Sequence, residues 1–481
     1  MNTQAELTTN VATNLADIID SASNGLAYTS QLNSEIILSL IGEPKSIIRD
    51  AVWGDIPLNR KEMLLIDSVP FQRLRRVQQL GFTSWTFPGA HHSRFEHCIG
   101  VYHLTRLALL HLARCGGYSF TMAEINTVLA AGLLHDIGHY PYSHAVEELD
   151  LNVIRNHEII GTEIVTGPEI APLLRHVWGV QPEKVAAMIT KSDDVPLTQN
   201  ERVLRNLISG ALDTDKLDYL MRDSRYCNVP YGMVDVQRLI DSLRIWPEDR
   251  TQTDGETRLQ LVIDEKGVGA LQSLIFARYL MFYNVYWHHT GRIATLMFLR
   301  SLQEALETGA FTSVELERSD DASVIALIQN TTQPGSIAHD LITDLRNRRF
   351  FKRAISLSED EPVFSHLAML KYDPARRKLL EEVWCKALSD LTGQQLRGYE
   401  VLLDIPEPKG FEMVLDVICE RPPHGWANPV PWGEVSGLNN DDMRKFHRHV
   451  RQIHIAVKGK ALAEAFCNHA PALLDMLQQV D

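Results

Sequence analysis

The sequence GLLHDIGHYPYSH, residues 132–144, is the stretch that best predicts the fold and the site of this chain. An imidazole and a carboxylate stand side by side at His135 and Asp136, and Gly138 and Pro141 break the chain after them. A segment of this content packs poorly into a core, whereas histidine and aspartate are ligands of first-row metal ions. The stretch therefore indicates a metal site at the end of a helix.

The residues before this stretch predict the helix that leads to it. In AEINTVLAAGLL, apolar residues recur at i, i+3, i+4 and i+8, which is one helix face: Ile125, Val128, Leu129 and Leu133. Helical periods continue from residue 47 to about residue 302. They include a helix that starts near Arg94, and residues 202–223 are also helical in pattern. Between residues 246 and 268, the alternation in TRLQLVIDE after a polar turn predicts a short β-hairpin.

The pattern changes after about residue 303. VFSHLAML and ARRKLLEEVWCKAL have helical spacing, whereas YEVLLDIPEP, FEMVLDVI and RQIHIAVKG are typical of short strands. We therefore predict a mainly α fold with three parts. These are an N-terminal extension (1–45), a helical core with the hairpin (46–302), and a smaller mixed α+β region (303–481) that serves in oligomerisation or regulation.

Composition narrows the class of protein. The chain has 481 residues, of which 45% are hydrophobic and 22% charged, as expected of a globular protein with a sizeable core. A formal net charge of −14 argues against broad nucleic-acid binding. None of the six cysteines forms a CxxC pair, and no signal peptide or run of about 18 apolar residues is present. We therefore expect a cytoplasmic protein that binds neither membrane nor nucleic acid.

Two further segments carry residues of the same chemistry as the opening stretch. HHSRFEHCIG contributes His97, and ISGALDTDKLDYLMRD contributes Asp213, Asp215 and Asp218. Two imidazoles and two carboxylates suit Mn, Fe, Ni or Zn and leave positions for water and a phosphate oxygen. A single histidine at a helix end is more often a surface or capping residue, so the metal interpretation depends on the three segments meeting in space.

Taken together, RFEHCIGV, LLHDIGHYPYSH and DTDKLDYLMRD resemble the HD-domain phosphohydrolases. The resemblance is greatest to the deoxynucleoside triphosphate (dNTP) triphosphohydrolase, or dGTPase-like, branch. PFQRLRRVQQLGFTSWTFPGAHHSRFEH follows the same pattern, so the resemblance covers about residues 45–300. It implies that residues 46–302 are an HD phosphohydrolase core. The activity implied is metal-dependent cleavage of a dNTP, by water attack at the α-phosphate, to deoxynucleoside and inorganic triphosphate.

The resemblance also implies roles for individual residues. The metal ligands are His97, His135, Asp136 and Asp215. The catalytic acid is His144, and His157 and Glu147 form a polar relay with it. Family members often have aspartate where this chain has Glu147. The ion itself remains open among Mn, Fe, Ni, Zn and Mg, and Mg is expected to accompany the nucleotide.

The substrate residues are implied in the same way. Cations on the phosphates are Arg94, Lys216 and Arg278. Gln79 and Asp223 match residues that contact the 3′-hydroxyl of the sugar. Leu80, Tyr219 and Tyr286 match residues that form a wall against the sugar. An apolar wall at C2′ disfavours a ribose hydroxyl. Without the resemblance, the three wall residues read as core positions at helical spacing. This chain also has Trp287 where the family can have glutamine.

A second nucleotide site is implied for the regulated members of the family. Asp67, Gln72 and Arg75 match positions that read the guanine of an activator, GTP or a dNTP. Aspartate accepts from base N–H groups and arginine donates to O6 and N7. An ordinary surface network of charges is the alternative. The family places this site at a subunit interface, so we expect a homo-oligomer, in particular a tetramer.

Two other functions use the same residues. One is an HD phosphohydrolase acting on a nucleoside monophosphate or cyclic nucleotide, which need not have Gln79, Leu80, Asp223 and Tyr286 together. The other is a non-catalytic nucleotide sensor, which is expected to have lost a ligand or His144. This sequence retains both.

Overall fold

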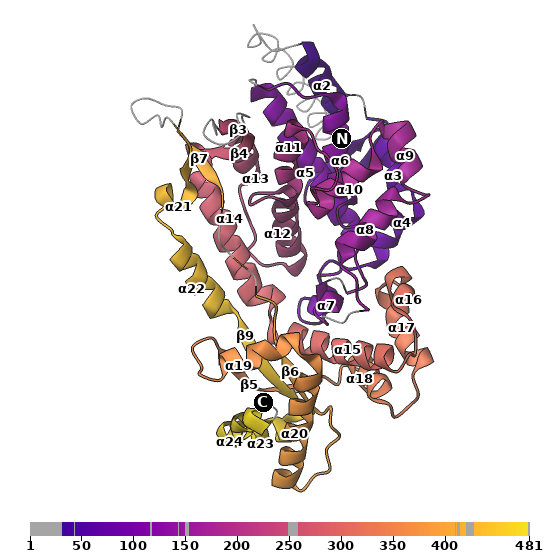
Figure 1. Cartoon of the computed structure of the whole chain (residues 1–481), viewed down its shortest axis with the longest axis vertical. Helices are drawn as coiled ribbons and strands as arrows, with labels where there is room; N and C mark the ends of the chain where they lie inside the picture. Colours follow the sequence, from indigo (N-terminus) through magenta and orange to yellow (C-terminus); the bar gives the residue numbers. More distant parts are fainter. Residues whose placement is uncertain are drawn as a thin grey trace, which may run out of the picture.

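The protein is described by a computed structural model that covers residues 31–42, 44–115, 118–142, 144–149, 153–248, 258–408, 410, 414–419 and 428–479. Helices dominate these residues and the sheets are small, so the predicted mainly α class is confirmed. The indigo and purple N-terminal half forms the upper part of the molecule, and the orange and yellow C-terminal segments form most of the lower part (Figure 1).

The upper part is a helical bundle built around α5 (Arg94–Cys115) and α6 (Met122–Leu134), which pack against each other. Helix α6 begins at a capping box, because the Thr121 side chain accepts from the Glu124 N–H while the Glu124 carboxylate accepts from the Thr121 N–H. Other helices of the upper part are α2 (Gln31–Ile41), α3 (Arg60–Ile66), α4 (Val69–Arg73), α8 (His157–Thr166), the short α9 (Ala171–Leu173), α10 (Pro182–Thr190), α11 (Gln199–Ser209), α12 (Thr214–Cys227) and α13 (Val236–Asp241).

The predicted hairpin is present as β3 (Leu243–Glu248) paired antiparallel with β4 (Arg258–Asp264). It belongs to a larger sheet of order β3-β4-β7-β8, in which β7 (Asp416–Ile418) and β8 (Val430–Pro431) return from the C-terminal region. A hairpin that the sequence did not predict, β1 (Ser46–Asp50) and β2 (Gly54–Leu58), precedes α3.

The lower part contains a three-stranded antiparallel sheet of order β5-β9-β6, which confirms the predicted strands at YEVLLDIPEP and RQIHIAVKG. Its strands are β5 (Lys352–Ser358), β6 (Val401–Asp404) and β9 (Gln452–Val457). The helices of this part are α15 (His289–Glu307), α16 (Ser313–Arg318), α17 (Asp321–Thr331), α18 (Ile337–Arg346), α19 (Phe364–Met369), α20 (Pro374–Thr392), α23 (Lys460–Asn468) and α24 (Ala470–Asp475).

Two segments connect the parts and define the space between them. Helix α14 (Val268–Met281) continues into a π-helical turn, η5 (Phe282–Tyr286), and α22 (Asn440–Val450) packs beside α14 (Figure 1). The predicted division at residue 302 falls inside α15, whose Phe298 packs with Phe82 and Tyr140 of the upper part. The division into three parts therefore stays a prediction.

The helical pattern of residues 202–223 belongs to two helices with a break between them, which the sequence did not predict. Helix α11 ends at Ser209, Gly210 is extended (φ −92°, ψ −169°), and Asp213 caps the start of α12. The Asp213 carboxylate accepts from the Lys216 N–H at 2.8 Å, which is the ordinary reason for an aspartate to begin a helix. The break turns Asp215 toward the bundle interior.

No helix within the described ranges combines the length and the apolarity that a membrane crossing requires.

Candidate active site

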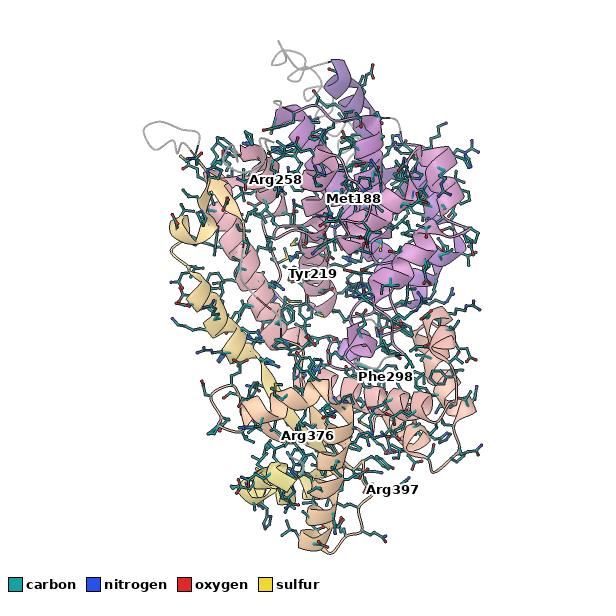
Figure 2. The ribbon with its side chains drawn as sticks, in the orientation of Figure 1. Met188, Tyr219, Arg258, Phe298, Arg376 and Arg397 are labelled. Atoms are coloured by element: carbon teal, nitrogen blue, oxygen red, sulfur yellow. The ribbon has the colours of Figure 1, made fainter. Side chains whose placement is uncertain are left out.

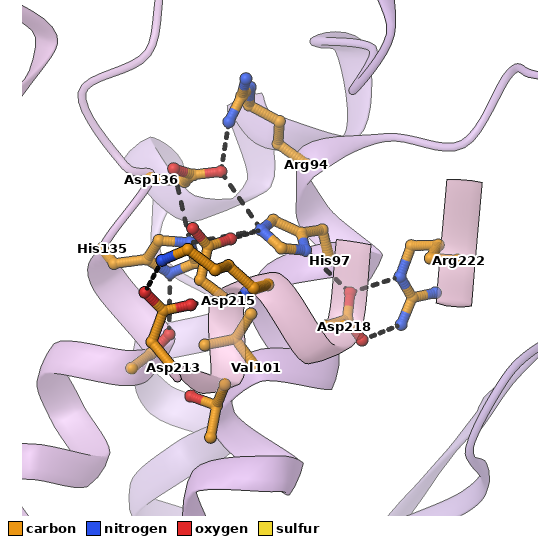
Figure 3. Close-up of polar contacts among 12 residues, drawn as sticks. Arg94, His97, Val101, His135, Asp136, Asp213, Asp215, Asp218 and Arg222 are labelled. Atoms are coloured by element: carbon orange, nitrogen blue, oxygen red, sulfur yellow. Dashed lines mark hydrogen bonds and ion pairs between the residues drawn. The ribbon is translucent and has the colours of Figure 1, made fainter. Parts of the chain in front are cut away.

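Three of the predicted ligands meet between α5, α6 and α12 (Figure 3). His97 lies in the first turns of α5, His135 at the end of α6 and Asp215 in the first turn of α12. The His97 Nε2 atom lies 3.0 Å from Asp215 Oδ1 and 3.3 Å from His135 Nε2, and His135 Nε2 lies 3.7 Å from Asp215 Oδ1. Ligands about 2.1 Å from one ion are separated by roughly 3.0–3.4 Å, so the spacing fits a shared ion.

The fourth predicted ligand, Asp136, lies beside this group. Its Oδ2 is 3.6 Å from His97 Nε2, and its Oδ1 is 3.4 Å from His135 Nε2. The same carboxylate also pairs with the Arg94 guanidinium and lies 3.2 Å from His139 Nε2. The oxygens of Asp136 are therefore divided among several cationic or hydrogen-bonding neighbours, and its place in the ligand set stays a prediction.

Outer hydrogen bonds orient both imidazoles for metal binding. The His135 Nδ1 donates to the Gly132 carbonyl at 3.0 Å, and the His97 Nδ1 donates to Asp218 Oδ2 at 2.7 Å. Carbonyl and carboxylate oxygens only accept, so each Nδ1 carries the hydrogen and each Nε2 presents a lone pair. Two such lone pairs 3.3 Å apart repel each other unless a cation lies between them. The donor set therefore fits a divalent first-row ion.

The charges of the group attract such a cation. Burial alone would lower the pKa of His97, but hydrogen bonds to Asp215 and Asp218 raise it to about 10. A proton on Nε2 therefore competes with a metal ion for the position beside Asp215, and metal binding would release that proton. Burial alone would raise the pKa of Asp215, but His135 and His97 hold it well below its usual range. The carboxylate of Asp215 is thus ionised at neutral pH, and it is the most exposed of the three ligand side chains, at 34%.

A buried chain of charges supports His97 from behind. Asp218 accepts from the Arg222 Nε and Nη2 at 2.8 and 2.9 Å and from the Trp53 indole at 2.5 Å. Arg222 is also bound to Asp50, at 2.8 Å. Trp53 and Asp50 come from the unpredicted β1–β2 hairpin, so their part in the site had no signal in the sequence.

The predicted substrate residues, with the exception of Lys216, line one cleft of about 580 Å³ beside this group. They are Gln79, Leu80, Arg94, Tyr219, Asp223, Arg278 and Tyr286. Figure 2 shows Tyr219 near the centre of the molecule. Other lining residues include Phe82, Tyr142, Glu147, Trp287 and Arg292. Pockets for small ligands commonly have volumes of about 300–1,000 Å³, so the cleft is large enough for a nucleotide.

Hydrogen bonds fix one polar corner of this cleft. Asp223 Oδ1 lies 2.7 Å from His92 Nε2, and Asp223 Oδ2 accepts from the Tyr286 hydroxyl at 2.7 Å. The rings of Tyr219 and Tyr286 meet edge to face with centroids 6.4 Å apart. Tyr286 ends the π-helical turn η5, a feature frequent at functional sites. The predicted sugar residues are therefore contiguous.

Lys216 does not join the other cations in the described lining of the cleft. Its ammonium pairs with the Asp213 carboxylate and donates to the Gly210 carbonyl at 2.9 Å. Asp213 thus has two roles in the fold, as the cap of α12 and as the partner of Lys216.

A second group of ligand-type side chains, His139, Glu147 and His157, lies next to the first. Glu147 Oε1 accepts from the His157 Nδ1 at 2.6 Å and from the His157 backbone N–H at 2.9 Å. The rings of His139 and His157 stack with centroids 3.8 Å apart and planes 15° from parallel. Lone pairs in parallel stacked rings do not converge on one ion, so the geometry favours a hydrogen-bonded relay.

His139 is a residue to which the sequence assigned no role. Burial, with nearby Arg94 and His157, lowers its pKa well below the usual range, and its Nε2 lies 3.2 Å from Asp136 Oδ1. It therefore connects the relay to the ligand group. The available signal was its position four residues after His135. His144 begins the short helix α7 (His144–Glu147), but its side chain lies outside the described part of the structure.

The predicted activator residues lie on the surface at α3, α4 and the turn that follows. Asp67 is the exposed residue that ends α3, and the Arg75 Nε donates to Gln72 Oε1 at 2.8 Å. The Arg75 guanidinium lies 3.5 Å from the centroid of the Phe95 ring. The pair of Gln72 and Arg75 also suits the surface-network alternative, so the activator site stays a prediction.

Comparison with known proteins identifies two matching regions. The family described as "HD domain" matches residues 94–222, and the "HD associated region" matches residues 234–421. The uncharacterized protein YwfO of Bacillus subtilis is 37% identical over 242 residues, which cover 50% of this chain and 51% of YwfO. The human deoxynucleoside triphosphate triphosphohydrolase SAMHD1 is 27% identical over 286 residues, covering 54% and 44% of the two chains.

A solved structure extends the similarity over most of the chain. A hypothetical protein from Aquifex aeolicus superposes with a TM-score of 0.63 at 26% sequence identity, covering 89% of this chain and 99% of that one. The chain spans about half the length of the curated relatives that it matches.

Proposed function

Since the chain belongs to the HD-domain superfamily and resembles its dNTP triphosphohydrolase branch, we propose that it is a divalent-metal-dependent dNTP triphosphohydrolase. The observation that carries the proposal is the position of Arg94. Its guanidinium contacts Asp136 of the ligand group, and its side chain lines the cleft that contains the predicted sugar residues. A triphosphate in that cleft thus has its reacting phosphorus beside the ligand group.

Charge neutralisation is the first task of the site. His97, His135 and Asp215, with Asp136 completing the set, would hold a divalent ion, which would supply polarisation of a phosphoryl oxygen and a lower pKa of bound water. Arg94 and Arg278 offset the negative charge of the phosphates where it develops in the transition state. Lys216 joins them once it leaves the Asp213 carboxylate, which in this structure holds it.

Proton transfer is the second task. Water attacks the α-phosphorus, the bond between that phosphorus and the 5′-oxygen breaks, and the 5′-oxygen takes a proton. His144 supplies this proton, because a histidine titrates near neutral pH. The pair of His157 and Glu147, joined at 2.6 Å, forms the relay behind it. Glutamate replaces the family's usual aspartate here and still reaches His157.

Sugar selection is the third task. Leu80, Tyr219 and Tyr286 line the cleft, and we assign to them the wall that crowds a 2′-hydroxyl and favours deoxyribose. Gln79 and Asp223 contact the 3′-hydroxyl. A GTP or dNTP activator binds at Asp67, Gln72 and Arg75, where two subunits of a homotetramer meet.

One assay tests the reaction. The purified chain is incubated with Mn²⁺ or Mg²⁺ and each dNTP, with and without GTP, and the products are separated by chromatography. Deoxynucleoside with inorganic triphosphate is the expected result. Release of pyrophosphate or monophosphate, or no turnover under any of these conditions, contradicts the proposal.

A pair of variants tests the site. His135→Ala and Asp215→Ala each remove one donor atom from the ligand group, so each is expected to lose bound metal and activity together. Metal analysis and the same chromatographic assay measure both losses. Full activity in either variant shows that the ligand assignment is wrong.

A further inference from the structure

The chain turns sharply between α16 and α17, and this corner, residues 317–321, reaches up to the loops around the site. Figure 1 shows α16 and α17 at the lower right, below α4 and α8. At the corner, Asp321 Oδ1 accepts from the Tyr142 N–H at 2.8 Å, and Asp321 Oδ2 accepts from the Gln78 N–H at 2.9 Å. The carboxylate is buried, with 7% of the residue exposed. One side chain thus holds two separate loops.

The two loops held by Asp321 form adjoining parts of the cleft lining, since Phe82 of one loop stacks on Tyr142 of the other. Gln78 immediately precedes Gln79 and Leu80, which line the cleft, and Tyr142 lines it directly. Tyr142 also lies two residues before His144. A displacement of either backbone therefore moves residues that the proposed reaction uses.

Tyr142 needs such support, because its backbone is in the left-handed region with φ at 56°. That conformation is uncommon for a residue with a side chain and persists where surrounding contacts enforce it. Here the ring of Tyr142 stacks on Phe82 with centroids 4.3 Å apart and planes 10° from parallel, while Asp321 binds its N–H.

Neighbouring residues of the corner hold the same loop. The Arg73 guanidinium donates to the Ser319 carbonyl from Nη2 at 2.8 Å and to the His139 carbonyl from Nη1 at 2.9 Å. Glu317 accepts from the Arg155 Nε and Nη2 at 3.0 and 2.8 Å. The loop between α6 and α8 is thus held near residues 139, 142 and 155.

The fold itself does not need the Asp321 carboxylate to begin α17. Asp320 caps that helix by accepting from the Ser323 N–H at 2.9 Å. Burial raises the pKa of Asp321 to about 6, so keeping a carboxyl at this place is unfavourable in itself. Burial of the Asp321 carboxylate is unfavourable, and Asp320 already caps α17. The contacts of Asp321 with the two loops are therefore what its side chain contributes to the structure.

We infer that Asp321 is a positioning residue that fixes the loop of His144 and the segment of Gln79 and Leu80 relative to each other in the lining of the cleft. The inference rests on the proposed function in so far as these residues act on a dNTP. It gives part of the region after residue 302 a role in the site.

The test compares Asp321→Asn with Asp390→Asn, an equal change of charge at an exposed position of α20. An asparagine keeps one acceptor oxygen, and its amide group meets the other backbone N–H without a hydrogen bond. Hydrogen–deuterium exchange of peptides containing Gln78 and Tyr142 should accelerate roughly tenfold in Asp321→Asn, which corresponds to one lost hydrogen bond. The control should exchange as the wild type does.

Activity and metal content complete the test. We expect kcat for dNTP hydrolysis to fall about 10–100-fold in Asp321→Asn, because a small misplacement of catalytic groups has a large effect on rate. Bound metal and thermal midpoint should stay within error of the control. Unchanged exchange at both peptides, or unchanged kcat, overturns the inference. Exchange that rises throughout the chain also overturns it, since that result indicates general destabilisation.

The exchange measurement separates this inference from the proposed function, because it needs no turnover. If the wild type hydrolyses no dNTP and Asp321→Asn still accelerates exchange at the two peptides alone, the positioning role of Asp321 is supported and the proposed reaction is wrong. If Asp321→Asn does not fold, Asp321→Glu takes its place, because it keeps the charge but moves the carboxylate by one methylene away from the two N–H groups. Faster exchange in the peptides containing Gln78 and Tyr142 then supports the positioning role, and unchanged exchange at both overturns it.

Discussion

Asp218→Asn should weaken metal binding without removing any metal ligand. Asp218 lies behind His97 and accepts from its Nδ1 at 2.7 Å, while Arg222 donates two hydrogen bonds to the same carboxylate. An asparagine has one acceptor oxygen. If that oxygen faces His97, the amide group opposes the Arg222 guanidinium; if it faces Arg222, the amide group opposes the hydrogen on His97 Nδ1. In the first orientation, His97 keeps a hydrogen bond, but to a neutral oxygen that holds it less strongly than a carboxylate does. In the second, the imidazole loses the partner that fixes its tautomer and its direction.

The magnitude follows from two separate effects. Loss of an outer partner of a ligating histidine typically lowers metal affinity about 10–100-fold, which is about 1.4–2.7 kcal/mol. Removing one charge of a buried pair lowers stability by about 3–5 kcal/mol. Arg222 is fully buried and keeps Asp50 as a partner, at 2.8 Å, so the lower end of that range is expected.

Asp50→Asn is the matched control. It removes the charge of a carboxylate that binds the same buried Arg222, but it leaves the hydrogen bond between Asp218 and His97 intact. Both variants should unfold at a lower temperature than the wild type. Metal affinity, measured by competition with a chelator of known affinity, should fall in Asp218→Asn alone. The reasoning is refuted if the two variants bind metal equally well, since Asp218 would then act only through stability.

Three other changes test separate parts of the structure. In Gly100→Ala, the new Cβ would lie 1.9 Å from Asp218 Oδ1, so we expect a loss of about 1–3 kcal/mol in stability and lower metal occupancy, measured by thermal unfolding and metal analysis; a wild-type midpoint contradicts the packing argument. Leu80→Ala removes part of the predicted sugar wall and should lower the preference for dNTP over rNTP, as the ratio of kcat/KM values, roughly tenfold; an unchanged ratio removes Leu80 from that role. Burial lowers the pKa of His454 to about 4, so between pH 6.5 and 4 the unfolded chain binds a proton that the folded chain does not, and stability falls as the pH falls through that window. His454→Gln should remove up to about 3 kcal/mol of this pH dependence at pH 4. An unchanged slope of the thermal midpoint against pH in the variant argues against this role of His454.

The meeting of His97, His135 and Asp215 could be anticipated because each lies in a short segment whose local pattern is informative. His135 ends a helix with clear apolar spacing, and Asp215 follows Asp213, a residue type that begins helices. The family resemblance indicated that the three segments meet in space, which their spacing in the sequence alone cannot show. The cleft residues were anticipated for the same reason, since most of them lie on helices or turns within the region of resemblance.

The contacts that sequence reasoning missed join residues far apart in the chain. Asp321 lies 179 positions from Tyr142 and 243 from Gln78, and no local period connects them. The break at Gly210 was missed because apolar residues on both sides of it keep a helical period, which hides one extended glycine. The contact of Lys216 with Asp213 was missed because a family pattern assigns a cation to its substrate, whereas without a nucleotide the nearest carboxylate competes for it.

Arg94 and Asp136 together explain how a metal ion and an arginine can act on one phosphate. A metal ion at the ligand group and the Arg94 guanidinium would be two cations at the same edge of a buried site, and two cations at short range repel each other strongly. The Asp136 carboxylate lies between Arg94 and the two histidines that would hold the ion: it contacts the Arg94 guanidinium, and its oxygens approach His97 and His135 at 3.6 and 3.4 Å. It therefore lowers the mutual repulsion and leaves Arg94 directed at the cleft. An incoming phosphate adds negative charge at this same boundary, where both cations attract it. Under the proposed function, the two residues of the HD pair would therefore differ in role: His135 would hold the ion, whereas Asp136 would also hold the arginine that receives the substrate.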